Sequence, residues 1–222
     1  MDDPTRHSLA FDAVILTDPD LRARQEAQNG LKQFDLVIRM VETFLEPERQ
    51  PFRFRPSHLL SLHREALLGI TGYAGNWRPS DIKIQGSKHK PPDAWEVPER
   101  IEELCDYINQ KWNEKSPVHL ASYVMWRLNW IHPFTDGNGR TSRAASYMIL
   151  CLKLGYVIPG KNTIPDQIAA DKTPYYKALE AADEAWEKDK DKIDLTKMKE
   201  LLSSMLAKQL YEIHAQSTCG DE

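Results

Sequence analysis

Residues 116–155 read SPVHLASYVMWRLNWIHPFTDGNGRTSRAASYMILCLKLG, and this stretch decides the fold. Its first part predicts an apolar helix over 116–131. Its last part, 140–155, is apolar on nearly every side, which is typical of a helix buried at the centre of a domain, and Gly155 would end that helix. The polar residues 132–143 therefore join two core helices, at a place where unpaired charge is expensive.

The rest of the chain is mostly helical by the same criterion. Apolar residues at helical spacing predict further helices over 21–45, 56–69, 98–112, 165–188 and 194–214. The segment between the second and third of these is rich in Gly and Pro, and its DIKIQ stretch alternates apolar and polar residues, as in a strand or one arm of a hairpin. The predicted fold class is mainly α, with a small β-hairpin as its one β element.

Composition limits the classes of function. The chain has 222 residues, 41% of them hydrophobic, which fits one globular domain, with or without a small appendage. A formal net charge of −4 argues against nucleic-acid binding. Three cysteines without CxxC spacing predict neither a disulfide framework nor a zinc site, so a cytoplasmic location is expected. We expect no secretory signal at the N-terminus and no membrane span, because no apolar stretch approaches about 20 residues.

The stretch DGNG before a helix is a candidate anion site. The first four N–H groups of a helix have no partner within it, and the helix dipole attracts negative charge to them. Gly137 and Gly139, on either side of Asn138, let the backbone curl and let a ligand approach closely. Arg140 and Arg143 lie three residues apart, on one helix face, and both lean toward the same site. Two guanidiniums and several N–H groups suit an oligophosphate.

Two further residues suggest a reaction at this site. Asp136 lies beside the expected phosphates, as a carboxylate that binds Mg²⁺ does. His132 has an unperturbed pKa near ~6.5, which suits a general base that deprotonates an attacking hydroxyl. The pattern indicates phosphoryl or nucleotidyl transfer. Taken singly, each feature has an ordinary alternative: a plain turn, a structural histidine, or solvated arginines.

HPFTDGNGRTSR (132–143) fits the signature of the Fic (FIDO-fold) family, HPFx-[D/E]-GNGR-xx-R, at every defined position. The chain resembles this family over about residues 25–210, since 62–92 is similar to its pre-motif helix and flap and 173–183 is similar to its post-motif segment. The resemblance implies a Fic/FIDO-fold helical domain over 51–215, with a flap at 78–92. An N-terminal helical extension, 1–50, would pack on that core, and a disordered tail would follow over 216–222.

The resemblance also implies a reaction: transfer of AMP from ATP to a Ser, Thr or Tyr hydroxyl of a target protein, with Mg²⁺. His132 would be the base and Asp136 the metal ligand. The three residues from Gly137 to Gly139 would bind the phosphates, and Arg140 and Arg143 would neutralise them. Family members that resemble Doc carry lysine where this chain has Gly139, so the glycine favours nucleotidyl over phosphoryl transfer.

Two other groups of residues receive roles from the resemblance. Tyr175 and Tyr176 would help to shape the nucleotide-base pocket. The flap would pair with an extended target segment by strand addition. The flap residues expected to do this are Ile82, Lys83, Ile84, Gln85 and Gly86.

Regulation is less defined. Many family members carry an inhibitory helix with the pattern [S/T]xxxE[G/N], whose glutamate pairs with the second arginine of the signature. Glu26 does not match, because Arg22 stands where Ser or Thr is expected. Glu200 follows Thr196 at the right spacing but precedes Leu201, and a solvent-exposed role is the alternative. Restraint by a separate regulatory protein or by self-association is therefore one expectation, and constitutive activity is the other.

Alternative functions remain open on the same fold. The chain could be a non-transferring nucleotide-binding regulator or a hydrolase that removes AMP. A kinase-like phosphotransferase is a further alternative, which Gly139 disfavours.

Overall fold

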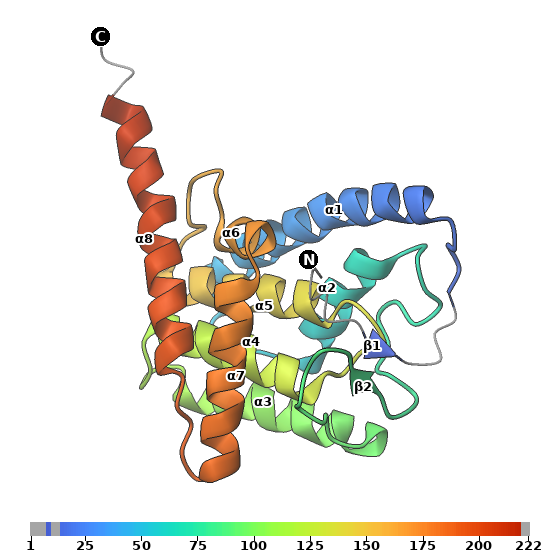
Figure 1. Cartoon of the computed structure of the whole chain (residues 1–222). Coiled ribbons are helices and arrows are strands. Elements are labelled where there is room, and N and C mark those ends of the chain that lie inside the picture. Colours follow the sequence, from blue (N-terminus) through green and yellow to red (C-terminus); the bar gives the residue numbers. More distant parts are fainter. Residues whose placement is uncertain (1–7, 10–13, 219–222) are drawn as a thin grey trace.

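The computed structural model describes residues 8–9 and 14–218, and most of this part is helical (Figure 1). The mainly α prediction is confirmed. Two short 3-10 helices, η1 (Pro47–Arg49) and η2 (Ala94–Glu96), accompany the longer ones. The α-helices are α1 (Pro19–Leu45), α2 (Pro56–Leu67), α3 (Val97–Lys111), α4 (Pro117–Ile131), α5 (Asn138–Leu154), α6 (Ile164–Ala170), α7 (Thr173–Lys188) and α8 (Thr196–Thr218).

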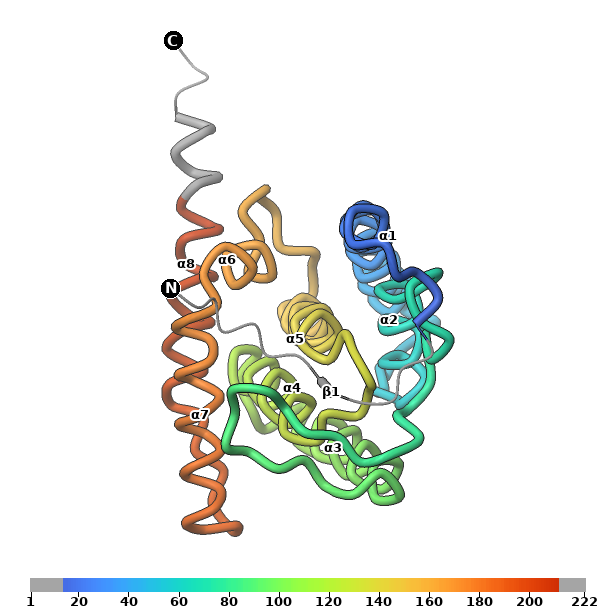
Figure 2. The backbone as a smooth tube through the Cα atoms, turned by 45° about the vertical axis from the view of Figure 1, so that its right-hand side comes forward, coloured from blue at the N-terminus to red at the C-terminus, as the bar shows by residue number. Residues whose placement is uncertain are grey.

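Helix α5 lies at the centre of the molecule, between α1 and α2 on one side and α4 and α6 on the other (Figure 2). Most of its residues are buried, as its apolar sequence predicts. Small residues allow α4 to pack closely against it, and the Ser146 hydroxyl donates a hydrogen bond to the Ala121 carbonyl at 2.8 Å. Gly155 ends the helix with a φ of 87°, a left-handed conformation that glycine adopts without strain.

Helix α1 forms a layer on α2 and α5. Its buried face includes two polar residues that bind backbone carbonyls, one within α2 and one just beyond its end. The amide nitrogen of Asn29 donates to Leu68 O at 2.9 Å, and that of Gln33 donates to Leu62 O at 2.9 Å. These two bonds fix how α1 lies against α2.

The predicted single helix over 165–188 is wrong, because the chain forms α6 and α7 with a break between them. Asp171 leaves the helical conformation, and its carboxylate accepts from the Thr173 N–H at 2.9 Å, which starts α7. Pro174 stands in the first turn of α7, where its missing N–H costs nothing. Helices α7 and α8 then lie side by side on the face of α4 (Figures 1 and 2).

The predicted β-hairpin is also wrong. Strand β2 (Lys83–Ile84) pairs antiparallel with β1 (Ser8–Leu9), with Ser8 opposite Ile84 and Leu9 opposite Lys83. The segment that would return after Gly86 contains Pro91 and Pro92, which have no N–H to donate to a ladder, so the partner strand comes from the N-terminal region instead.

The C-terminal helix runs further than expected. Helix α8 continues to Thr218 and therefore covers 216–218, the start of the predicted tail, whereas 219–222 lie outside the described residues. Within the described part of the chain, no helix combines the length and apolar character needed to cross a bilayer.

Candidate functional site

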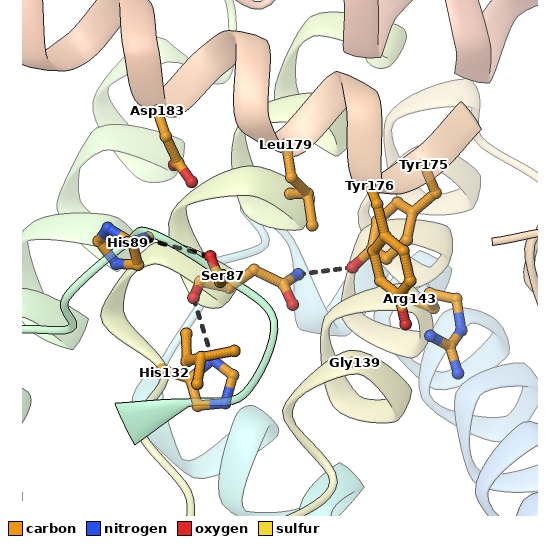
Figure 3. A pocket seen from close by; sticks show the side chains of 11 residues that line it. Ser87, His89, His132, Gly139, Arg143, Tyr175, Tyr176, Leu179 and Asp183 are labelled. Carbon is orange, nitrogen blue, oxygen red and sulfur yellow. Dashed lines mark hydrogen bonds between the residues drawn. The ribbon is translucent and has the colours of Figure 1, made fainter. Parts of the chain in front are cut away.

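His132 ends α4 in a left-handed conformation, with φ 51° and ψ 58°. Its ring lines a cavity beside Arg143 and Tyr176 (Figure 3). Ring atom Nδ1 lies 3.2 Å from the Asn129 carbonyl. Because a carbonyl can only accept, Nδ1 carries the hydrogen, and Nε2 is then the nitrogen with a lone pair that can take up a proton. This tautomer is the one that a general base requires.

The loop after His132 is held from inside. Phe134 is fully buried, and its ring stacks on that of His63 with centroids 3.7 Å apart. The Asn138 side chain accepts from the Phe134 N–H at 2.9 Å and donates to the Phe134 carbonyl at 2.8 Å. The Asn138 side chain thus shapes the loop. In the predicted phosphate site, only the backbone N–H of Asn138 would contact a phosphate.

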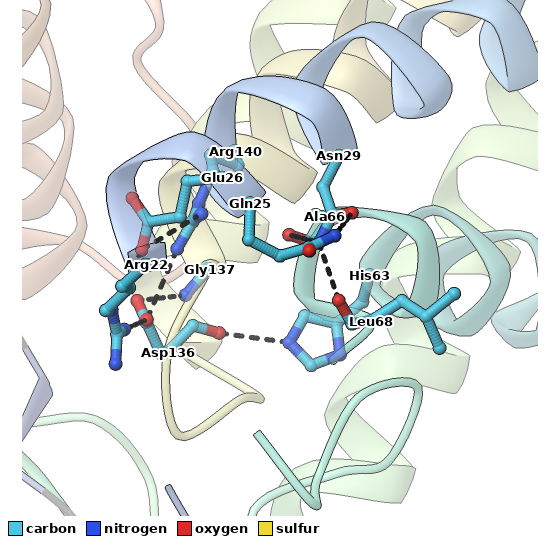
Figure 4. Close-up of polar contacts among 10 residues, drawn as sticks. All are labelled: Arg22, Gln25, Glu26, Asn29, His63, Ala66, Leu68, Asp136, Gly137 and Arg140. Atoms are coloured by element: carbon cyan, nitrogen blue, oxygen red, sulfur yellow. Dashed lines mark hydrogen bonds and ion pairs between the residues drawn. The ribbon is translucent and has the colours of Figure 1, made fainter. Parts of the chain in front are cut away.

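His63 of α2 holds the same loop from the other side (Figure 4). Its Nδ1 accepts from the Gly75 N–H at 2.9 Å, so Nε2 carries the hydrogen and donates to the Asp136 carbonyl at 3.0 Å. Burial lowers the pKa of His63 to about 4, more than the nearby Asp136 raises it. His63 is therefore neutral at pH 7, which its bond to Gly75 requires.

Stability should fall below neutral pH because of two buried histidines. Burial lowers the pKa of His58 and of His63 from 6.5 to about 4. Below pH 6.5 the unfolded chain binds protons that the native state excludes, so the free energy of unfolding falls as pH drops from 6.5 toward 4. Above pH 6.5 both states leave these histidines neutral, and no stability is lost. Each histidine accounts for a loss of about 3 kcal/mol in the free energy of unfolding over this pH range. Urea unfolding should give a lower free energy of unfolding at pH 4.5 than at pH 7, and His63→Gln should make this difference smaller by about 2–3 kcal/mol. The same difference in wild type and variant would contradict the prediction.

Gly137 precedes α5 in a left-handed conformation with φ 76°. A Cβ at this position would lie 2.4 Å from Leu67 Cδ2, closer than packed atoms allow. Glycine is therefore needed here for its conformation and for the space it leaves. As a result, the loop can lie directly against α2.

Gly137→Ala should lower the free energy of unfolding by about 2–4 kcal/mol, from backbone strain and overpacking together. Gly86→Ala is the matched control, because Gly86 has a φ of 73° with no atom within 4 Å of the added Cβ. The control should cost only about 1–2 kcal/mol of strain. Thermal unfolding of both variants measures the difference, and equal losses would mean that Leu67 moves aside freely.

An open cleft of about 640 Å³ surrounds the N-terminus of α5. It is large enough for a nucleotide. His132, Asp136, Arg140 and Arg143 all line it, so the structure brings together the predicted catalytic, metal and phosphate groups. Among the described residues, Arg140 Nη1 is a buried nitrogen with no hydrogen-bond partner. Such a donor suits an incoming anion.

Arg143 lies deeper than Arg140, and burial lowers the pKa of its guanidinium, against the effect of Tyr175. The Tyr175 hydroxyl interacts with Arg143 and accepts from the Asn129 amide at 2.7 Å. Tyr175 is itself buried. Tyr176 lines both the open cleft and the cavity around the His132 ring in Figure 3, which is called the inner cavity below. Both predicted tyrosines therefore lie at the site: Tyr175 contributes its hydroxyl group, and the Tyr176 side chain lines the cleft.

Asp136 has the donor chemistry that a magnesium ion requires, as one carboxylate beside the predicted phosphate site. Burial favours its neutral form, but Arg140, the Gly137 N–H and Arg22 together hold the pKa of Asp136 below its usual value. The carboxylate is thus ionised at neutral pH. Within the described residues, no three acidic, His or Cys side chains are grouped for a metal, so phosphate and water would complete the shell.

Two residues of α1, Arg22 and Glu26, reach this site (Figure 4), although the sequence pattern excludes Glu26 as an inhibitory glutamate and gives Arg22 no role. Arg22 donates to Asp136 Oδ2 at 2.7 Å and to Glu26 at 3.0 Å. Glu26 lies 3.6 Å from Arg140 Nη1. In the sequence, Arg22 and Glu26 have the i, i+4 spacing of an ordinary exposed ion pair. In the structure, the Arg22 guanidinium pairs with Asp136, the predicted metal ligand, and the Glu26 carboxylate lies beside Arg140, a predicted phosphate ligand.

The predicted flap is a single segment without a returning strand, and it passes beside the inner cavity. Ile82 and Ile84 are buried, and Ile84 lines the inner cavity with His132. Lys83, Gln85 and Gly86 are exposed. One edge of β2 is paired with β1, so the chain itself now provides a strand where a target segment was expected to add.

Glu200 does not reach the site. It is exposed on α8, where it pairs with Lys197 at 3.4 Å. It is not among the residues that line either the open cleft or the inner cavity.

Residues 53–150, which contain α2, the flap, the motif and most of α5, match the model of the Fic/DOC family. The chain is a Fic-family protein.

Three relatives illustrate the match. "Protein adenylyltransferase Fic" of Drosophila willistoni is 29% identical over 163 residues, which are 72% of this chain and 30% of the relative. Fic-1 of C. elegans has a similar structure, with a TM-score of 0.67 at 22% identity over 92% of this chain and 56% of that one. The structure of BepC of Bartonella tribocorum, solved with bound AMPPNP, gives a TM-score of 0.57 at 17% identity and covers 86% of this chain and 88% of BepC. The chain thus spans under a third of the Drosophila relative.

Proposed function

We propose that this Fic protein is a protein adenylyltransferase that transfers AMP from ATP to a Ser, Thr or Tyr hydroxyl of a target protein. The single observation that carries the proposal is the convergence of His132, Asp136 and Arg140 on one cleft at the start of α5. The name of the Drosophila relative and the AMPPNP bound to BepC support it from outside the chain.

In the proposed reaction, the phosphates of ATP bind the first N–H groups of α5 and the guanidiniums of Arg140 and Arg143. His132 Nε2 takes the proton from the target hydroxyl. The hydroxyl oxygen forms a bond to the α-phosphorus, and the bond from that phosphorus to the β-phosphate oxygen breaks, so pyrophosphate leaves. Magnesium held by Asp136 would supply charge neutralisation at the phosphates.

The partners and compartment are proposed on the same basis. The target is a protein with an exposed hydroxyl, which would reach the flap either at its open side or by displacing β1. Regulation by another protein or by self-association remains a proposal. Two buried free cysteines, Cys105 and Cys151, support the cytoplasm as the compartment.

ATP labelled at either the α- or the γ-phosphate tests the proposal. The full chain is incubated with Mg²⁺, alone and with cell lysate, and the proteins are separated. Label should reach protein from α-labelled ATP only. Transfer from γ-labelled ATP would instead favour a phosphotransferase, and no transfer with retained ATP binding would favour the nucleotide-binding regulator.

A further inference from the structure

We propose that Arg78 is a positioning residue that joins the base of the flap to the backbone of His132. The inference rests on the proposed function in one respect: its catalytic consequence requires that His132 acts as the base. Its structural content, that the flap and the motif loop move as one unit, can be tested independently of any activity.

The contacts of Arg78 come from three separate segments. Nε donates to the His132 carbonyl at 2.9 Å, Nη1 donates to the Ser80 carbonyl at 3.0 Å, and Nη2 donates to the Pro92 carbonyl. The side chain is fully buried, with 0% of its surface exposed. The backbone N–H of Arg78 donates to the Pro133 carbonyl at 2.8 Å.

These contacts explain how His132 keeps an uncommon conformation. A left-handed backbone is strained for a residue other than glycine and persists only where the surroundings enforce it. The Arg78 side chain donates to the His132 carbonyl and the Arg78 backbone N–H donates to the Pro133 carbonyl, so two successive carbonyls are held where the chain leaves the helix. A guanidinium also suits the end of α4, because the last carbonyls of a helix lack partners within it and attract a cation.

The other two carbonyls lie at the two ends of the flap. Ser80 precedes β2 and Pro92 is the last residue of the flap, so one planar side chain holds both ends together. A second link lies further along the flap, where His89 Nε2 donates to the Trp130 carbonyl at 2.7 Å. The flap is therefore attached to the last turn of α4, from which the His132 ring projects.

The consequence concerns the meeting of the two substrates. A target segment on the flap presents its hydroxyl to His132, whereas the nucleotide binds at the start of α5, which His63 and Asn138 hold independently of Arg78. Loss of Arg78 should therefore impair transfer and the use of the target protein more than it impairs nucleotide binding.

Hydrogen exchange of the full chain, followed by mass spectrometry, tests the structural part. Arg78→Lys keeps the charge but cannot reach three carbonyls at once. It should raise exchange about tenfold or more in two peptides together, 80–92 and 132–137. Arg127→Lys is the matched control, because Arg127 is also buried but packs against Trp130, with its guanidinium carbon 4.2 Å from the ring centroid. It should leave both peptides within about twofold.

Activity measurements complete the test. In Arg78→Lys, the affinity for a non-hydrolysable ATP analogue should stay within about threefold, while kcat for transfer falls about tenfold or more and KM for the target rises. Faster exchange in only one of the two peptides, or equally across α8, would overturn the proposal. Joint exchange without any transfer by the wild type would leave the positioning role intact and reject the proposed function.

If Arg78→Lys does not fold, the wild-type protein provides the same test. In low concentrations of denaturant, amides of 80–92 and 132–137 should open together, with one free energy and one denaturant dependence. Two separate opening events would overturn the proposal.

Discussion

Replacing His132 with alanine is expected to lower AMP transfer by about 10²–10⁴-fold and to leave the affinity for ATP within about twofold. In the proposed reaction, the imidazole takes the proton from the attacking hydroxyl but is not one of the groups that would hold the phosphates. The measurement is transfer of α-label to protein, alongside calorimetric titration with a non-hydrolysable ATP analogue.

His119→Ala is the matched control for this loss. His119 lies on the same helix and is hydrogen-bonded to the Tyr107 hydroxyl at 2.9 Å, remote from the cleft. Its loss should cost stability but reduce transfer by less than about threefold. Full transfer by His132→Ala would exclude His132 as the base, and equal losses in both variants would indicate general damage to the fold.

The second large effect concerns divalent metal ions at Asp136. Asp136→Asn should weaken Mn²⁺ binding in the presence of an ATP analogue by more than about tenfold, since it removes the ligand's charge. Arg22→Ala should strengthen binding about fivefold, because it frees the carboxylate from a cation 2.7 Å away. Both side chains are partly exposed, at 30% and 28%, so the pair is worth only about 1 kcal/mol. Electron paramagnetic resonance of Mn²⁺ measures both changes.

Arg24→Ala is the control for Arg22→Ala, because Arg24 is an exposed arginine on the same helix. It should leave Mn²⁺ binding within about twofold. Unchanged binding in Arg22→Ala would show that the ion pair with Asp136 does not compete with metal, and unchanged binding in Asp136→Asn would move the metal site elsewhere.

The central part of the fold and the site could be predicted because their signals are local. Ser116 caps α4 and Gly155 ends α5 where the sequence indicates. The motif between these helices carries its glycines, arginines and His132 within a dozen positions, and the structure places them around one cleft.

The features that could not be predicted depend on contacts between distant segments. The partner of β2 is β1, more than 70 positions earlier in the chain, and nothing in either short segment specifies that pairing. The sequence pattern excludes Glu26 as an inhibitory glutamate, and its approach to Arg140 depends on the packing of α1 on α5. Arg78 lies in a segment that reads as loop, and only the folded chain brings the three carbonyls around it.

A crystal structure of the full chain with Mg²⁺ and a non-hydrolysable ATP analogue tests most directly whether the start of α5 captures a polyphosphate beside a catalytic histidine. The phosphates should lie against the N–H groups of residues 138–140 and the guanidinium of Arg140, with the metal on Asp136 and Arg22 displaced from it. A nucleotide bound elsewhere, with the ion pair between Arg22 and Asp136 intact, would contradict the proposed site.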